Sequence, residues 1–507
     1  MKIIAKTFQG LEEVLADEVR QIGATEVCVG NRMVSFTGDQ AVLYRANICL
    51  RTAVRVLKVI EEFKASDADQ VYERVKQMPW EELMSEHDTF IVDAVCFSED
   101  FRHSKFVAYR TKDAIADRFR SLTGQRPNVS ISDPTLRVHV HISNHDVSIA
   151  LDSSGESLHK RGYRTGTVAA PINEVLAAGI VLLSGWKGEC DFIDPFCGSG
   201  TILIEAALIA RNINPGLFRK EFAFEKWRDF DRDLFDKLYN DDSAERPFDH
   251  HIYGFDINRQ AIRIATQNVQ SAGVGDVVSV QQRDFREGGL LLPESENEEE
   301  GRPKAIMITN PPYGERITTD DILTLYSTIG TKLKQQFAGG DAWIISLHEE
   351  CFDAIGMRPS TKFALYNGAL PCELRKYQVF SGSLRDHRAE GHDIKSAEER
   401  IRNRKYKPHH REDETRGGSD ARKRGGSRDD EHYFLSRPAT SDKRSSGRGF
   451  KGNPTHKPSF AGDGEPELNR YNFKWGDRGA GYRRDTGDQP YPRTWEKKES
   501  PKDNPEA

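Results

Sequence analysis

Cysteine is scarce and scattered in this chain. Its 507 residues include seven cysteines, an odd number, and no two of them form a Cys-x-x-Cys pair. This spacing excludes a disulfide framework and argues against a zinc site, so we expect reduced thiols and no metal centre. No stretch approaches the roughly twenty apolar residues of a membrane-spanning helix, and no signal-peptide pattern follows Met1. The sequence therefore predicts a cytoplasmic protein with no membrane partner.

Hydrophobic residues are also sparse, at 37% against 30% charged residues, and the formal net charge is −6. The shortage is greatest from residue 381 onward, where eleven Ile, Leu, Phe and Trp occur with no Val or Met, and 29 Lys/Arg stand against 23 Asp/Glu. This apolar content is about half the ~20% below which a chain is expected to be disordered. We therefore predict a disordered, basic, Gly/Arg-rich tail over residues 383–507, whose Arg-Gly-Gly segments resemble those that hold RNA loosely.

A buried strand, a glycine turn and a helix follow one another between Asp191 and Ala207. Asp194 ends the strand, and Gly198 and Gly200 frame the turn, where glycine lets the backbone approach a ligand beside a helix N-terminus. A dinucleotide fingerprint would need a third glycine where Leu203 stands, and a P-loop would need a lysine directly after the turn. An acidic strand end before a Gly-x-Gly turn instead favours S-adenosylmethionine as the cofactor.

A second motif, Asn310-Pro311-Pro312-Tyr313, follows another apolar strand about a hundred residues later. It resembles the Asn/Asp-Pro-Pro-Tyr motif of methyltransferases that act on exocyclic amines of bases. The lone pair of such an amine is delocalised into the ring, and the Asn310 oxygen and the Pro311 carbonyl can accept its N–H bonds and free it. Tyr313 can stack on a flipped base. An amide is no strong base, so catalysis would depend on positioning and charge stabilisation.

Two further strands end in acidic residues. Asp256 lies 56 residues after Gly200 (256 − 200), whereas a dinucleotide site expects its acid after about 20 residues. We expect Asp256 to bind the ribose hydroxyls and Asp284 to accept from the adenine amine, with Phe285 beside the ring. The predicted cofactor-binding residues are Asp194, Pro195, Gly198, Gly200, Thr201, Asp256, Asp284 and Asn310.

The chain before these motifs has the pattern of two smaller α/β units. Residues 1–45 read as a strand, a helix and a second strand, and residues 46–156 as a longer α/β segment with basic positions. The second segment resembles a THUMP domain, an RNA-binding module found fused to RNA-modifying enzymes. A basic, aromatic hinge follows it, in which Tyr163 is available for stacking on a base. The predicted RNA-binding residues are Arg102, Lys105, Arg110, Arg137, Lys160, Arg161, Tyr163 and Arg164.

Taken together, residues 1–380 are similar to the bacterial THUMP-containing 23S rRNA guanine-N2 methyltransferases of the RlmL type. The resemblance implies an α/β fold: a Rossmann-like class I methyltransferase domain with a C-terminal antiparallel hairpin, preceded by a ferredoxin-like unit and a THUMP domain. It also implies transfer of a methyl group to the N2 amine of guanine in 23S rRNA, on naked RNA or on a pre-50S particle. Some members carry a second methyltransferase unit where this chain has its tail, so we expect a single activity. The expected boundaries are 1–45, 46–156, 157–382 and 383–507.

Three alternatives remain open at this point. Related enzymes with the same pairing of modules methylate guanine N2 in tRNA. An adenine-N6 DNA methyltransferase fits less well, because the N-terminal module indicates RNA. A non-catalytic RNA-binding ribosome-assembly factor with a vestigial cofactor site is a third reading, against which the complete acidic set and the intact Asn310 argue. The sequence indicates no oligomeric state.

Overall fold

The computed structural model describes most of the chain up to residue 380 and a few short pieces beyond it. The described residues are 1–168, 171–287, 305–312, 319–368, 370–380, 400–401, 403–404, 406, 482–483 and 491–492. Tyr313 and most of the predicted tail lie outside them. Within the described part of the chain, no helix is both long and apolar enough to cross a membrane.

The N-terminal part is built on an eight-stranded sheet with the order β2-β3-β1-β4-β8-β7-β5-β6. The long strand β4 pairs with β1 on one side and with β8 on the other, so the two predicted α/β units share one sheet. Its elements are β1 (Lys2–Lys6), α1 (Glu12–Gln21), β2 (Thr25–Gly30), β3 (Met33–Thr37), α2 (Gln40–Cys49), β4 (Arg55–Lys64), α3 (Ala68–Gln77), α4 (Trp80–Leu83), β5 (Thr89–Phe97), α5 (Ser104–Thr123), β6 (Asn128–Val129), β7 (Leu136–Ser143) and β8 (Asp146–Asp152).

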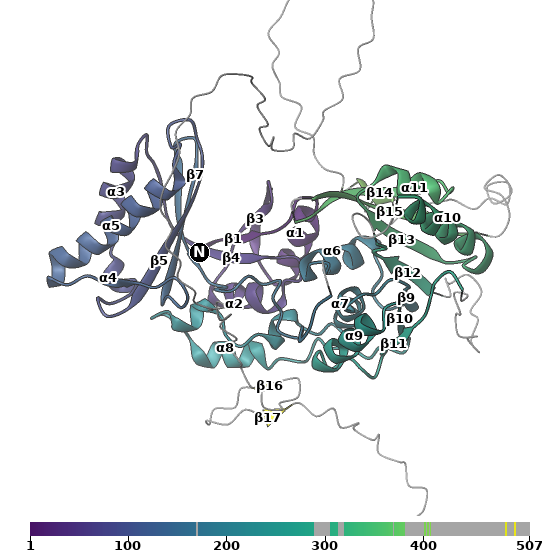
Figure 1. The fold of residues 1–507 in the computed structure, drawn as a ribbon. Helices are drawn as coiled ribbons and strands as arrows, with labels where there is room; N and C mark the ends of the chain where they lie inside the picture. Colours follow the sequence, from purple (N-terminus) through teal and green to yellow (C-terminus); the bar gives the residue numbers. More distant parts are fainter. Residues whose placement is uncertain are drawn as a thin grey trace, which may run out of the picture. The chain divides into compact units, whose positions relative to one another are not determined.

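One face of this sheet is apolar and the other is polar, as period-two alternation dictates. In β7, Val138, Val140 and Ile142 are fully buried, and the residues between them are only partly so. Figure 1 shows α3 and α5 together on one side of β5 and β7, and hydrophobic residues of both helices join the core of the sheet. Helix α5 begins at Ser104, and His103 occupies its N-cap position without a side-chain hydrogen bond.

The C-terminal part is a seven-stranded sheet with the order β11-β10-β9-β12-β13-β15-β14. The first five strands are parallel, and the hairpin β14–β15 closes the sheet in antiparallel orientation, as predicted. Its elements are α6 (Glu174–Ser184), β9 (Asp191–Asp194), α7 (Thr201–Ala210), η1 (Pro215–Phe218), η2 (Ala223–Lys226), α8 (Arg232–Tyr239), β10 (Ile252–Asp256), α9 (Arg259–Ser271), β11 (Val278–Gln282), β12 (Ala305–Thr309), α10 (Thr319–Gln336), β13 (Asp341–Ser346), α11 (Glu349–Ala354), β14 (Thr361–Asn367) and β15 (Leu370–Gln378), with two short strands, β16 (Tyr482–Arg483) and β17 (Tyr491–Pro492), later in the chain.

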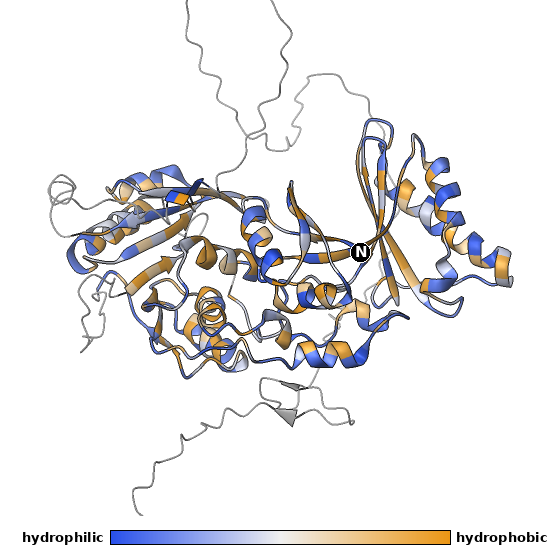
Figure 2. Cartoon of the chain, turned by 180° about the vertical axis from the view of Figure 1, so that it is seen from behind, coloured by the Kyte–Doolittle hydropathy of each residue, from blue (hydrophilic) through white to orange (hydrophobic). Residues whose placement is uncertain are grey.

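Helices cover both faces of this second sheet. Residues of α6 and α7 form one core with Phe192 of β9, and residues of α10 and α11 form another with the neighbouring Ile193. Strands buried on both faces read as continuous apolar runs, and such runs are how the sequence predicted β9 and β12. Figure 2 shows alternating hydrophobic and hydrophilic bands around the outer helices, which present an apolar stripe to the sheet that they cover. Helices α6 and α7 are instead buried on nearly all sides.

The aromatic segment after α7 does not pack on the sheet that contains its neighbours in sequence. Phe222, Phe224 and Phe235 belong to the core of the N-terminal sheet. The Phe224 ring stacks on Tyr44 of α2 with ring centroids 4.5 Å apart, and Asp231 donates its backbone N–H to the Tyr44 hydroxyl at 2.9 Å. This insertion therefore ties the chain of the second sheet to the core of the first.

Candidate active site

The candidate site lies at the carboxyl ends of the parallel strands. Strand β9 lies between β10 and β12, and Gly254 of β10 is in register with Asp194. The chain leaves β9 toward β10 on one side and later returns on the other side as β12, which makes this edge the topological switch point where α/β sheets bind ligands. The predicted residues Asp194, Asp256 and Asn310 follow or end these three adjacent strands, so the sheet brings both sequence motifs to one place.

The glycine turn has the backbone geometry that only glycine adopts without strain. Gly198 and Gly200 have φ angles of +54° and +82°. A side chain at Gly200 would place its Cβ 3.3 Å from the Cβ of Ala265 in α9. No side chain caps α7, which begins at the next residue, so the positive end of the helix dipole remains available to an anionic or carboxylate group. The turn therefore forms a cradle closed by α9 on one side.

Asp194 is held by a residue of the second motif. It is almost fully buried, and its Oδ1 accepts a hydrogen bond of 2.6 Å from the Thr309 hydroxyl and one of 3.1 Å from the Phe196 backbone. Burial raises the pKa of Asp194 to about 7, and the nearby Asp256 carboxylate adds to this, whereas the two hydrogen bonds lower the pKa. Sequence reasoning missed Thr309, although its place at the end of β12, directly before Asn310, was a signal.

Asp256 and Asp284 occupy the ends of the next two strands. Asp256 accepts from the Gly198 backbone at 3.0 Å, which fixes the glycine turn to β10. Asp284 forms an ion pair of 2.7 Å with Arg286, which lowers the pKa of its carboxyl. The Phe196 and Phe285 rings lie with centroids 5.1 Å apart, so the predicted adenine position borders an aromatic pair.

Asn310 presents a buried hydrogen-bond acceptor at this sheet edge. Its Oδ1 atom is buried, and no residue in the described part of the chain donates a hydrogen bond to it. A buried acceptor left unpaired costs about 1–3 kcal/mol, which favours a ligand that brings an N–H group. Pro311 beside it is buried, and Pro312 is exposed. The third predicted catalytic residue, Tyr313, lies outside the described residues.

Two residues of the basic hinge, Arg161 and Tyr163, support the site from inside and do not face solvent. The side chain of Arg161 and the Tyr163 hydroxyl both bond to Glu205 of α7, at 3.3 and 2.9 Å, and all three residues are at most 2% exposed. Arg164 donates to the Thr201 hydroxyl at 2.9 Å and pairs with Glu174 at the same distance. The prediction that Arg161 and Tyr163 contact RNA is therefore corrected, because the Glu205 carboxylate of α7 holds both in the interior. Arg164 is only partly buried, and its RNA contact remains a prediction.

Asn268 of α9 is a further residue that sequence reasoning missed. It is buried and joins two loops: its Nδ2 donates to the carbonyl of Ser199 in the glycine turn at 3.0 Å and to that of Gly166 at 3.1 Å. Its Oδ1 accepts from the backbone of Thr165 at 2.8 Å. One amide thus fixes the segment that follows the hinge to the turn that forms the cradle. An asparagine inside a helix gives no sequence signal for such a role.

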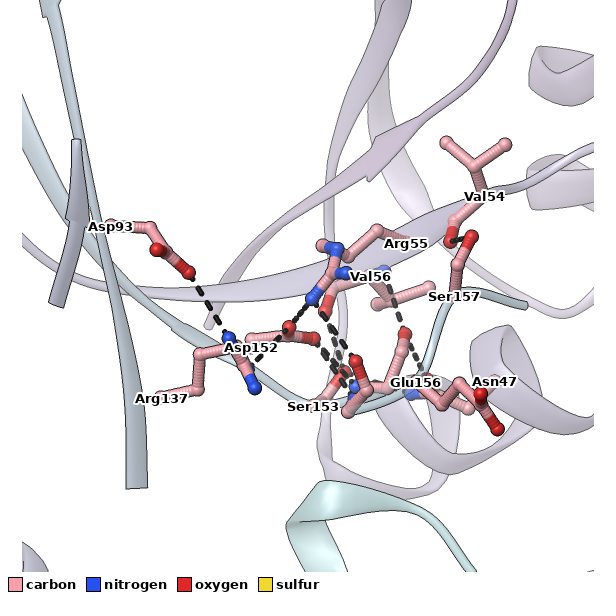
Figure 3. A network of polar contacts seen from close by, with 12 residues as sticks. Asn47, Val54, Arg55, Val56, Asp93, Arg137, Asp152, Ser153, Glu156 and Ser157 are labelled. Atoms are coloured by element: carbon pink, nitrogen blue, oxygen red, sulfur yellow. Dashed lines mark hydrogen bonds and ion pairs between the residues drawn. The ribbon is translucent and has the colours of Figure 1, made fainter. Parts of the chain in front are cut away.

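The other predicted RNA-binding residues lie nearer the surface. Arg102, Lys105 and Lys160 are exposed, and Lys160 pairs with Glu156 at 2.6 Å. Arg110 pairs with Asp69 at 2.6 Å, with its guanidinium over the Tyr72 ring. Figure 3 shows Arg137 between Asp93, at 3.2 Å, and Asp152, which also pairs with Arg55. These five remain predictions. In the described residues, no three His, Cys, Asp or Glu side chains gather as a metal site would require.

Comparison with protein families divides the chain as the fold does. Residues 2–57 match the RlmL ferredoxin-like domain, residues 65–152 the THUMP domain, and residues 161–376 the family described as RMKL-like, methyltransferase domain. The resemblance that the motifs predicted is thus confirmed.

Curated proteins that resemble most of the chain agree with these matches. The ribosomal RNA large subunit methyltransferase K/L of Photobacterium profundum is 38% identical over 397 residues, which are 77% of this chain and 55% of that protein. The putative RNA methyltransferase slr0064 of Synechocystis is 36% identical over 383 residues, covering 74% of this chain and 96% of that protein. The chain spans about half the length of the K/L relatives that it matches.

Solved structures give the same result. A possible methylase from Clostridium difficile 630 has a TM-score of 0.67 and 31% identity, covering 75% of this chain and 99% of its own. SMU.472, a putative methyltransferase complexed with SAH, has a TM-score of 0.66 and 28% identity, with 75% and 99% covered. With its ferredoxin-like, THUMP and Rossmann-like methyltransferase domains in this order, the chain belongs to the RMKL-like methyltransferase family.

Proposed function

We propose that this protein is an S-adenosylmethionine-dependent RNA methyltransferase that modifies the exocyclic N2 amine of a guanine in 23S rRNA. The observation that carries the proposal is the buried Oδ1 of Asn310, to which no described residue donates a hydrogen bond, at the same sheet edge as the glycine cradle. The RNA substrate class is supported by the THUMP domain and by the names of the relatives. We also keep the domain boundaries near residues 46, 157 and 382 as proposals.

The hydrogen-bonding groups of the cradle match those of the proposed cofactor. Gly198 and Gly200 give backbone access to the methionine portion, and the uncapped start of α7 faces its carboxylate. Asp194 accepts from its amino group, Asp256 from its ribose, and Asp284 from its adenine amine. When bound, the cofactor supplies an electrophilic methyl group on a sulfonium.

The acceptor amine is oriented by Asn310 and Pro311. The Oδ1 of Asn310 and the carbonyl of Pro311 accept its two N–H groups, which turns the nitrogen lone pair out of the ring plane and toward the methyl group. Neither group is a strong base, so the barrier is lowered by positioning and by stabilisation of the positive charge that develops on the nitrogen. The hydrogen bond from Thr309 to Asp194 couples the acceptor side of the site to the cofactor side.

The test is methyl transfer from labelled S-adenosylmethionine to unmodified total RNA, separated into 23S, 16S and tRNA before nucleoside mass spectrometry. Label in 23S rRNA as N2-methylguanosine is the expected result, and a pre-50S particle is the substrate to try beside naked RNA. Label in tRNA would mean that the proposed reaction is right and that the substrate is tRNA instead of 23S rRNA. Cofactor binding with no transfer to any RNA or particle would overturn the enzyme assignment in favour of an assembly factor.

We also infer a cytoplasmic site of action. All seven cysteines are free thiols, as in proteins of reducing compartments, and the proposed substrate is made there. Fractionation of cells that express the full-length chain, followed by immunoblotting, tests this inference.

A further inference from the structure

A groove of about 470 Å³ lies on the polar face of the eight-stranded sheet, away from the cradle. Residues of β1, β3, β4, β7 and β8 line it, so it spans the ferredoxin-like part and the THUMP part of the sheet. Its volume falls in the range of small-ligand sites, about 300–1,000 Å³. Its nitrogen groups come from Lys2, Lys6, Lys64, His139 and His141, and its carboxylates from Glu62 and Asp146.

Two of the three lysines are already neutralised. Lys2 pairs with Glu62 at 2.7 Å, and Lys64 pairs with Asp146 at 3.5 Å. Lys6 is the exception: its ammonium contacts the Met33 sulfur at 3.8 Å, and the structure places no carboxylate of a described residue within ion-pair distance of it. A half-buried ammonium without a counter-charge is an anion-binding group.

The surroundings of Lys6 are electropositive. Burial and the nearby Arg32 lower the pKa of Lys6. Burial, together with the charge of Lys6, lowers the pKa of His139 to about 4 and also lowers that of His141, so both rings are neutral near pH 7 and each offers one N–H donor. Two nearby acids form ion pairs with arginines and not with Lys6. Asp93 pairs with Arg137, and Asp152 pairs with Arg137 and Arg55 (Figure 3).

We propose that this groove binds a backbone phosphate of the RNA substrate, with the Lys6 ammonium as its charge partner and the His139 and His141 rings as flanking donors. A phosphodiester offers acceptors and one negative charge, which complements one cation and two N–H donors. The half-buried Phe63 also lines the groove and provides an apolar surface for a ribose or base, the combination that single-stranded RNA sites use. The proposal rests on the proposed RNA substrate and adds a contact away from the catalytic edge.

The chain provides a matched pair of variants. Lys2 and Lys6 lie on the same strand and the same face of the sheet, and of the two only Lys2 pairs with a carboxylate in the part of the chain that the structure describes. We expect Lys6→Met to weaken binding of unmodified 23S rRNA transcript to the full-length chain about tenfold at ~100 mM KCl. The slope of log Kd against log salt should fall by about 0.7–0.9, the contribution of one phosphate contact. Lys2→Met should leave the slope unchanged, and Lys6→Arg should restore binding.

S-adenosylhomocysteine binding, measured by calorimetry, reports whether each variant is folded. If Lys6→Met also loses this binding, the double variant His139→Gln, His141→Gln replaces it, with weaker RNA binding and an unchanged salt slope as the expected result. Equal RNA affinity for wild type, Lys6→Met and the histidine variant would overturn the proposal that the groove binds a phosphate, and it would leave the enzyme assignment intact. A folded wild-type chain that binds no RNA would overturn the proposed function, and this inference with it.

Discussion

Replacing Thr309 with valine removes the hydroxyl that reaches Asp194 and leaves a side chain of the same shape. The hydroxyl donates to Oδ1 over 2.6 Å in a fully buried setting, so no water takes its place. A hydrogen bond to an ionised group contributes about 1.5–3 kcal/mol, and one to a neutral group about 0.5–1.5 kcal/mol. The variant therefore loses about 1–1.5 kcal/mol more in the ionised form of Asp194 than in the protonated form.

One pKa unit corresponds to ~1.36 kcal/mol, so we expect the pKa of Asp194 to rise by about one unit in Thr309→Val. In the wild type this pKa is about 7. In the proposed site Asp194 binds the cofactor's ammonium group, and only its carboxylate form accepts that hydrogen bond, so we expect the affinity for S-adenosylhomocysteine to be full above the pKa of Asp194. It falls as the pH drops through the pKa.

Isothermal titration calorimetry between pH 6 and pH 9 gives the affinity at each pH. The midpoint should lie near pH 7 in the wild type and about one unit higher in Thr309→Val. Thr309→Ser retains the hydroxyl and serves as the control, with an unchanged midpoint. The ligand's own ionisation is common to all three proteins, so only the difference between midpoints counts. Equal midpoints for wild type and valine variant would refute the claim that Thr309 sets the charge of Asp194.

Three further variants test the site. Asn310→Ala should reduce methyl transfer to background and leave cofactor affinity within about twofold; an equal loss of both, measured by calorimetry and by label transfer, would contradict its assigned role. Asp256→Ala should raise the cofactor Kd about tenfold or more, because Gly198 loses its anchor and the ribose its acceptor; an unchanged Kd would remove this carboxylate from the site. Asn268→Ala should raise the cofactor Kd about tenfold through the loosened glycine turn, and Gln267→Ala, on the exposed side of the same helix, should not. If the two helix variants behave alike, the turn does not depend on the amide.

Several parts of the fold could be predicted because their signals are local in sequence. The strand, turn and helix around Gly198 and Gly200 require glycine at positive φ, and the structure has both glycines there. Acidic residues at successive strand ends indicated a common sheet edge, because carboxyl ends of parallel strands meet. The antiparallel hairpin that closes the sheet is the one that the family resemblance implied.

The errors concern residues whose role depends on a distant partner. Tyr163 and Arg161 have the composition of an RNA contact, yet Glu205, more than forty residues later, takes both into the interior. Phe224 follows α7 in sequence but belongs to the core of the N-terminal sheet, because its ring stacks on Tyr44 of α2. Local composition cannot distinguish a surface that contacts RNA from a buried segment. A basic side chain can pair with a phosphate or with a buried carboxylate, and an aromatic ring can stack on a base or pack in a core.

The sequence by itself determined the chemistry of this protein: the glycine cradle, the acids at the strand ends and the Asn-Pro-Pro-Tyr motif are each fixed by neighbouring residues. Only the tertiary structure decided which groups share a proton or a charge. The hydroxyl of Thr309 meets Asp194 across 115 positions, Asn268 meets Thr165 across 103, and among the described residues Lys2 has a carboxylate partner whereas Lys6 has none. Hydrogen bonds and ion pairs extend only about 3–4 Å, so they depend on how the sheets pack distant segments together, and the order of residues along the chain does not contain that distance.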